Sequence, residues 1–265
     1  KTNSVRLVKL LIDQEVIDKN AKDDNGLTPL MYAVSNENIT VAFYLLSLPD
    51  IDLNSHDSDQ NTILHFAAKC NDLDLVKFII QYNHHLLNTP NVFGETMLHL
   101  ACKHGNVDLV AYLINAEHAN YYVTTKNNQT ICHYAIQSGK LPIIEYIIKL
   151  NTTNLAFPDD NQHNILHLAC QNENDDVEIV KYLISLDQFK DDLSFKDSNN
   201  NTYLHYACGK GNYHIAVFLI NTKEIDITGV NSNNETILHK ACESGNLKLV
   251  KFLINLEKID VSLRN

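Results

Sequence analysis

One tetrapeptide recurs in phase along the whole chain, and this repetition constrains the fold more than any other feature. It reads Thr-Ile-Leu-His at 62–65 and Thr-Met-Leu-His at 96–99. Repetition at such a period is typical of solenoid proteins, in which each unit buries its apolar face only against its neighbours. The seven copies are 34 residues apart, except for one step of 38, and begin at Thr28, Thr62, Thr96, Thr130, Asn164, Thr202 and Thr236.

Each copy predicts two helices joined by a tight turn. The Thr at the start can cap a helix through its hydroxyl, and Asn164 can cap equally well. Leu98 and Ala101 follow at helical spacing, and a Gly-Asn break comes at 105–106. A second amphipathic segment then follows, as in VDLVAYLI at 107–114. A stretch rich in Asn, Asp and Ser leads to the next copy, which favours a polar turn there.

The in-phase Thr-x-Leu-His-x-Ala pattern, the Gly-Asn turn and the second helix of the LVKFLI type resemble the ankyrin repeat. The resemblance covers essentially the whole chain. It implies an all-α solenoid of stacked helix-turn-helix units with projecting β-hairpin-like loops. We expect a single ankyrin-repeat domain over 1–265, made of a partial repeat, 1–22, and the repeats 23–56, 57–90, 91–124, 125–158, 159–196, 197–230 and 231–265.

The chain departs from the usual ankyrin pattern just before the repeated Thr. The glycine that the family places two residues before the Thr survives only as Gly26 and Gly94. Asparagine, which stands at three of the other copies, tolerates a left-handed backbone better than Gln60 and Gln162 do. We therefore expect loop tips that are less regular than in an idealised array.

Both ends of the sequence resemble partial repeats. VRLVKLLI at 5–12 aligns with 107–114 as a second helix without its first, and KIDVSLRN at 258–265 resembles a linker without a following repeat. We expect a segment of a longer array, with additional ankyrin repeats of the same chain at both ends. We also expect the first helix to expose apolar surface.

Histidine and cysteine recur close together, which raises the question of a metal site or a nucleophile. Cys102, for example, follows His99 by three residues. The ankyrin resemblance implies instead that the imidazole bridges the capping Thr and the neighbouring loop. The histidine position is shared by His65, His99, His133, His167, His205 and His239.

The cysteine position also favours a structural role. Ala68 and Ile136 take it in two repeats, and this alternation is what a small buried apolar slot permits. We expect Cys70 alone at the surface, and no catalytic residue, cofactor or metal. A Cys/His metalloprotein is the alternative, which elemental analysis would distinguish. The slot is filled elsewhere by Cys102, Cys170, Cys208 and Cys242.

Two further patterns receive structural interpretations. The fifth repeat is longer by four residues, and its acidic stretch at 173–178 lacks calcium-loop spacing, so we expect a solvated turn. One aromatic position lies in the Leu/Ile stripe of the second helix, which favours core packing over a stacking surface for bases. It is held by Tyr44, Phe78, Tyr112, Tyr146, Tyr182, Phe218 and Phe252.

Composition argues against several classes of partner. The 265 residues carry a net charge of -11, so we expect no nucleic acid and no membrane as partner. No apolar run reaches ~18 residues, the length that spans a bilayer. The six cysteines are at least 30 residues apart, which indicates reduced thiols and a cytoplasmic or nuclear location.

The resemblance implies a non-enzymatic protein–protein interaction module or scaffold. It would bind another protein on its concave loop-and-first-helix face, and the net charge of -11 favours a basic or neutral partner. The alternative is a regulatory or targeting ankyrin arm of a larger enzyme or channel protein. Val92 and Phe93 are apolar at a projecting tip, and exposed aromatics are common interface anchors, so we expect the third and fourth repeats at the centre of the site. The candidate partner-binding residues are Asp59, Asn61, Val92, Phe93, Glu95, Lys103, His104, Tyr121, Tyr122, Lys126, Gln129, Gln137, Asp160 and His163.

Overall fold

The structure is a computed structural model that describes residues 2–13, 17–70, 72–150, 155, 157–190, 193–222 and 225–256. The chain divides into two compact units, Lys1–Lys126 (unit 1) and Asn127–Asn265 (unit 2). Apart from two isolated β-bridges, the described residues hold only helices, turns and loops. None of the helices among them is long and apolar enough to cross a membrane.

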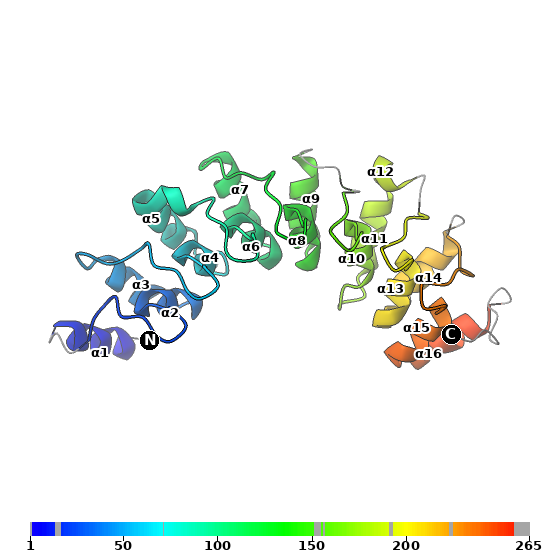
Figure 1. Cartoon of the computed structure of the whole chain (residues 1–265), viewed down its shortest axis with the longest axis horizontal. Helices are drawn as coiled ribbons and strands as arrows, with labels where there is room; N and C mark the ends of the chain where they lie inside the picture. The colour runs from blue at the N-terminus through cyan, green and yellow to red at the C-terminus, as the bar shows by residue number, and fades with distance from the viewer. Residues whose placement is uncertain are drawn as a thin grey trace. The chain divides into compact units, whose positions relative to one another are not determined.

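Unit 1 contains a leading helix and three helix pairs, and in each pair the second helix packs against the first. Figure 1 shows the first helices α4 and α6 in one row and the second helices α5 and α7 in another. The leading helix α1 (Thr2–Asp13) packs on α3 and exposes Leu7 and Leu10, as expected for its apolar surface. The pairs are α2 (Pro29–Ser35) and α3 (Ile39–Leu46), α4 (Ile63–Ala67) and α5 (Leu73–Asn83), and α6 (Met97–His104) and α7 (Val107–Asn115); a 3-10 turn, η1 (His84–Leu86), follows α5.

Unit 2 contains four helix pairs built in the same way. Each first helix packs on the first helix of the next pair, so the apolar faces are buried between pairs. The pairs are α8 (Ile131–Gln137) and α9 (Leu141–Lys149), α10 (Ile165–Cys170) and α11 (Val177–Ile184), α13 (Tyr203–Lys210) and α14 (Tyr213–Asn221), and α15 (Ile237–Ser244) and α16 (Leu247–Ile254), with a short extra helix, α12 (Asp187–Lys190), after α11.

The repeated Thr begins the first helix, as predicted. Thr96 is the N-cap of α6, and with His99 it forms a capping box in which each side chain accepts a hydrogen bond from the other residue's backbone amide. The N-cap of α2 lacks this box because Met31 replaces the histidine. Gly105 then ends α6 with a left-handed φ of 67°, a conformation that suits a residue without a β-carbon.

The aromatic position of the second helices is half-buried, whereas the sequence favoured the core. A lysine of the preceding pair reaches over two of these rings. The Nζ of Lys77 is 5.4 Å from the ring centre of Tyr112, and that of Lys181 is 5.9 Å from Phe218. These rings cover the edge of the core and keep one side in solvent.

Two cysteine assignments are wrong. Cys70, expected at the surface, is buried because α4 ends at Ala67 and the chain turns back, so that the Cys70 thiol donates to the carbonyl of Val34 at 2.9 Å. Cys242, expected in the buried slot, is exposed. Within the described part of the chain no further helix pair packs over α15, so nothing there closes the slot.

The acidic stretch of the longer fifth repeat begins in a turn, with Glu173 and Glu178 exposed as predicted, but Asp175 also has a structural role. Asp175 caps the next pair: its Oδ2 accepts the His214 amide at 2.9 Å and its Oδ1 accepts the Ile215 amide at 3.0 Å. Carboxylates are favourable at a helix N-terminus, where backbone amides lack partners. The segment after α11 forms the short helix α12, and its Phe189 side chain is buried.

Candidate functional site

The loop tips before each Thr share one backbone turn, so the expectation of irregular tips is wrong. The residue two before the Thr is left-handed in every copy, and Gln60 and Gln162 adopt φ of 63° and 62°. A role that was not predicted from the sequence belongs to an Asp or Asn five residues before the Thr. The Oδ1 of Asn91, for example, accepts the amides of Phe93 and Glu95, both at 3.0 Å. Such bonds hold the turn at Asp23, Asp57, Asn91, Asp159, Asp197 and Asn231.

Backbone hydrogen bonds also join each tip to the next within a unit. In unit 1 the Val92 amide donates to the carbonyl of Asp59 at 2.8 Å, and the Lys126 amide donates to that of Phe93 at 2.9 Å. In unit 2 the Ser232 amide donates to the Asn199 carbonyl at 2.8 Å. The tips are therefore held in place before any partner binds, which limits the entropy lost on binding.

Three of the capping histidines bridge the capping Thr and the next loop tip, as the ankyrin resemblance implied. The Nδ1 of His65 accepts the Thr62 amide at 3.0 Å, and its Nε2 donates to the carbonyl of Glu95 in the next tip at 3.0 Å. His133 and His205 make the same bonds to the next tip at 3.2 Å and 3.1 Å. Burial lowers the pKa of all three rings, so they are neutral at pH 7 and serve as fixed connectors between repeats.

The buried thiols of Cys70 and Cys208 are poorly suited to nucleophilic chemistry. Burial raises the pKa of Cys70 to about 11 and that of Cys208 to about 12, so both stay protonated near neutral pH. A reactive cysteine requires the thiolate. Among the described residues there is also no group of three or more His, Cys, Asp or Glu side chains arranged to hold a metal ion.

Unit 1 has a groove between its tips and its first helices, which we call the aromatic groove. Its volume is about 290 Å³. Phe66 of α4 and Leu100 of α6 are half-buried in its floor, and Phe93 at the rim is 54% exposed. Lys69 and His104 line it at the ends of the two helices. The full lining is Ser35, Asn61, His65, Phe66, Lys69, Asn91, Phe93, Glu95, Leu100 and His104.

Unit 2 has a groove at the corresponding position, which we call the Lys240 groove. Its volume is also about 290 Å³. Lys240 crosses it, with its Nζ 2.9 Å from Oε2 of Glu235 and 3.0 Å from Oε2 of Glu243. Its floor is Tyr206, whose hydroxyl is already bonded. The full lining is Gln171, Asn201, His205, Tyr206, Gly209, Lys210, Lys240 and Glu243.

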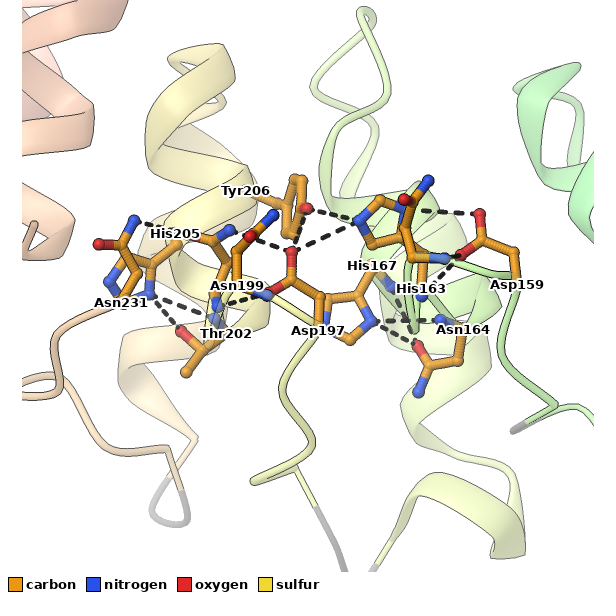
Figure 2. Close-up of polar contacts among 12 residues, drawn as sticks. Asp159, His163, Asn164, His167, Asp197, Asn199, Thr202, His205, Tyr206 and Asn231 are labelled. Atoms are coloured by element: carbon orange, nitrogen blue, oxygen red, sulfur yellow. Dashed lines mark hydrogen bonds and ion pairs between the residues drawn. The ribbon is translucent and has the colours of Figure 1, made fainter. Parts of the chain in front are cut away.

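Tyr206, which lines the Lys240 groove, also belongs to a polar network with His163, Asp159 and Asp197, and Figure 2 shows these residues. The Tyr206 hydroxyl donates to Oδ2 of Asp197 at 2.6 Å, and the Nε2 of His163 lies 2.6 Å from the same hydroxyl, which places a hydrogen on Nε2. Nδ1 of His163 lies 3.5 Å from Oδ2 of Asp159. The side chains of Asp159 and Asp197 are 2% and 0% exposed, so this network joins two repeats and does not present a reactive surface.

The same network shifts the protonation of the neighbouring groups. Burial, together with the charge of His163, lowers the pKa of His167 to about 4, whereas Asp197, the Asn201 carbonyl and Asp159 act in the opposite direction. Burial and the bond to Asp197 raise the pKa of Tyr206. Both groups are therefore neutral at pH 7 and unsuited to general acid or base catalysis at that pH.

The structure brings some of the predicted unit 1 residues together. Asn61, Phe93, Glu95 and His104 line the aromatic groove. Phe66 and Leu100 also line it but were not among the predicted site residues. Phe66 and Leu100 occupy one repeat position, which Lys240 holds in the last repeat, and this variability was the signal to look for. The lining does not include Asp59, Val92, Lys103, Tyr121, Tyr122 or Lys126.

The predicted unit 2 residues do not line the Lys240 groove. The ring of His163 belongs to the buried network, and Gln129 donates from Nε2 to Oδ2 of Asp159 at 3.2 Å. Gln137 and Asp160 are exposed. We therefore leave His163 and Gln129 out of the proposed binding surface, because their side chains already hold tips together.

A comparison with protein families agrees with this architecture. A family model described as ankyrin repeats in three copies matches residues 1–57, 48–125, 64–156, 117–192 and 166–265. These overlapping matches extend over both units. No curated protein matches the chain.

Proposed function

Because this chain belongs to the ankyrin repeat family, whose repeats generally mediate protein–protein interaction, we propose that it binds a protein partner through the loop-and-first-helix face of unit 1. The array is an all-α ankyrin-repeat solenoid, and such repeats are typically non-catalytic. The neutral histidines and protonated thiols support a binding role without catalysis by these residues.

The observation that carries the proposal is the position of Phe93. Its ring is 54% exposed at the rim of the aromatic groove, although its backbone is fixed on both sides. Its amide donates to Asn91 Oδ1 and its carbonyl accepts the Lys126 amide at 2.9 Å. A large apolar side chain held in solvent on a rigid backbone is what an interface anchor requires. The second and third repeats thus form the centre of the proposed site.

Replacing the tip side chains tests the proposal. Val92→Ser with Phe93→Ser should reduce capture of the partner from the native cell at least tenfold, with little change in the thermal midpoint, because the backbone bonds of the tip remain. The matched control, Asn233→Ser, changes the equivalent tip of the last repeat and should leave capture intact. A photo-crosslinking residue at position 93 should label the captured protein directly. Equal capture by both variants, without a crosslink at 93, would place the site elsewhere.

The second candidate is a regulatory or targeting ankyrin arm of a larger enzyme or channel protein. It uses the same surface, with the partner supplied by another part of the same polypeptide. The full-length open reading frame distinguishes it from a separate scaffold.

A further inference from the structure

The aromatic groove has the size and lining for side chains of a peptide. Its volume of about 290 Å³ lies at the lower end of the ~300–1,000 Å³ range of small-molecule sites. Phe66 and Leu100 form an apolar floor, and the Phe93 ring stands at the rim. Such a groove suits one large apolar side chain of an extended segment, because burying it removes the floor and the rim from water together.

The charges at the edge of the groove differ from those of the chain as a whole. The chain carries a net charge of -11, yet the positively charged side chain of Lys69 lines the groove just after α4 ends. Lys69 is exposed and makes no ion pair with any described residue. The carboxylate in the lining is that of Glu95, whose Oε2 accepts the side-chain amide of Asn91 at 2.8 Å. The helix-end side of the groove therefore favours a partner carboxylate.

In the Lys240 groove the lysine is already neutralised by carboxylates of the chain itself. There Lys240 is held between Glu235 and Glu243 at 2.9 Å and 3.0 Å. In the aromatic groove Leu100 replaces this lysine, so the floor is apolar and the cation, Lys69, stands at the edge.

We propose that the aromatic groove binds an extended segment of a partner protein that presents one large apolar side chain next to an acidic side chain. The apolar side chain packs on Phe66 and Leu100 below the ring of Phe93, and the neighbouring carboxylate pairs with Lys69. This inference rests on the proposed function and refines it. The sequence favoured a basic or neutral partner protein. The proposal concerns only the segment that enters the groove, which is acidic whatever the charge of the rest of the partner.

A random 12-residue peptide library displayed on phage, selected on the whole chain, tests the proposal. Enriched peptides should share a Phe, Leu, Ile or Met beside an Asp or Glu. A synthetic peptide of the enriched sequence, labelled for fluorescence anisotropy, then measures affinity. Replacing its apolar residue by Ser, or its acidic residue by Lys, should each weaken binding at least tenfold.

Charge exchange locates the contact. Lys69→Glu should weaken binding of the acidic peptide at least tenfold and restore binding of the peptide in which the acid is replaced by Lys. Lys210→Glu, an exposed lysine in the lining of the Lys240 groove, is the matched control and should change neither affinity. Both positions are on the surface, so the variants should fold.

Three results would overturn the inference: enrichment of basic peptides, an acidic peptide indifferent to Lys69→Glu, or no enrichment at all. The proposed function would still stand in each case if the captured partner crosslinks at position 93. Loss of that crosslink, with peptide binding at Lys69 retained, would instead overturn the proposed role of the Phe93 tip.

Discussion

The aromatic groove of unit 1 and the Lys240 groove of unit 2 are lined by corresponding positions of different repeats. Each has a volume of about 290 Å³. They differ at several repeat positions: Phe66, Leu100, Phe93 and Lys69 in the first correspond to Tyr206, Lys240, Asn233 and Gly209 in the second. The repeats thus form such a groove once in each unit, and side chains at a few positions determine how much of it is open to a partner.

The residue in the floor of each groove determines whether that floor is available to a partner. The hydroxyl of Tyr206 bonds to Asp197 and to His163, so the second floor belongs to the stacking of its own repeats. Phe66 has no hydroxyl, and Leu27 stands in unit 1 where unit 2 has His163. The hydroxyl and the histidine that bonds to it thus tie the second floor to the fold, and unit 1 has neither group at these positions.

The largest expected effect concerns pH and unit 2. The pKa of His167 is lowered from 6.5 to about 4 by burial, so the unfolded chain takes up a proton below pH 6.5 that the folded chain takes up only near pH 4. Stability present above pH 6.5 should be lost as the pH falls towards 4, by up to about 3 kcal/mol for this group. Hydrogen exchange of the α10 amides at pH 7 and 4.5 measures the loss.

His167→Gln should flatten this dependence, leaving the part due to the other buried histidines. Ile165→Val, a core change in the same helix, should lower stability equally at both pH values. If His167→Gln and the unmodified chain lose the same stability on acidification, His167 is not the group responsible.

The next effect compares Asp197 in the polar network of unit 2 with Asp57 at the corresponding position of unit 1. Asp197→Asn removes a carboxylate whose Oδ2 accepts a hydrogen bond from the Tyr206 hydroxyl and lies 3.4 Å from Nε2 of His163. Asp57 is its counterpart in unit 1, where Oδ2 accepts a hydrogen bond from the side-chain amide of Asn61. Asp197→Asn should destabilise α13 by about 3 kcal/mol, and Asp57→Asn should destabilise α4 by about 1 kcal/mol. Hydrogen exchange in each helix gives both values, and equal losses would contradict the special role of the unit 2 network.

A smaller effect is expected from converting the first groove into the second. Leu100→Lys places a lysine where Lys240 stands, and it should weaken partner or peptide binding about tenfold, or about 1.4 kcal/mol. The half-buried position makes a large change in the melting temperature unexpected. Isothermal titration calorimetry measures the affinity. Lys240→Leu serves as the control, and an unchanged affinity for Leu100→Lys would remove the floor from the site.

The smallest effect is expected from the reverse conversion. Asn233→Phe with Lys240→Leu supplies a rim ring and an apolar floor to the second groove but leaves Tyr206 in its network. A weak second site should appear, with an affinity about tenfold below that of the first, equivalent to about 1.4 kcal/mol. Stoichiometry by calorimetry at high peptide concentration detects it. A second site as strong as the first would show that the floor tyrosine is irrelevant.

Sequence periodicity predicted the helix pairs because local rules act at every copy. Thr caps a helix, a histidine three residues later completes the box, and glycine ends the helix, all within ten residues of chain. The Asx turn that keeps Gln60 left-handed is equally local, and Asp57 could have predicted it. A capping histidine such as His65 bonds to a carbonyl of the next repeat. This contact also follows from the sequence, because the regular 34-residue period places the next loop beside the histidine.

Only the tertiary structure decided which side chains remain available. Cys70 and Cys242 exchanged their expected environments because burial depends on what packs over a residue and not on its place in the repeat. The sequence placed His163 and Phe93 alike at projecting tips, yet the first is enclosed by Asp159, Asp197 and Tyr206 and the second stands in solvent. Periodicity determines the backbone, whereas the contacts between neighbouring copies determine the surface, because those contacts involve residues about 30 to 40 positions apart in a chain that is not strictly periodic.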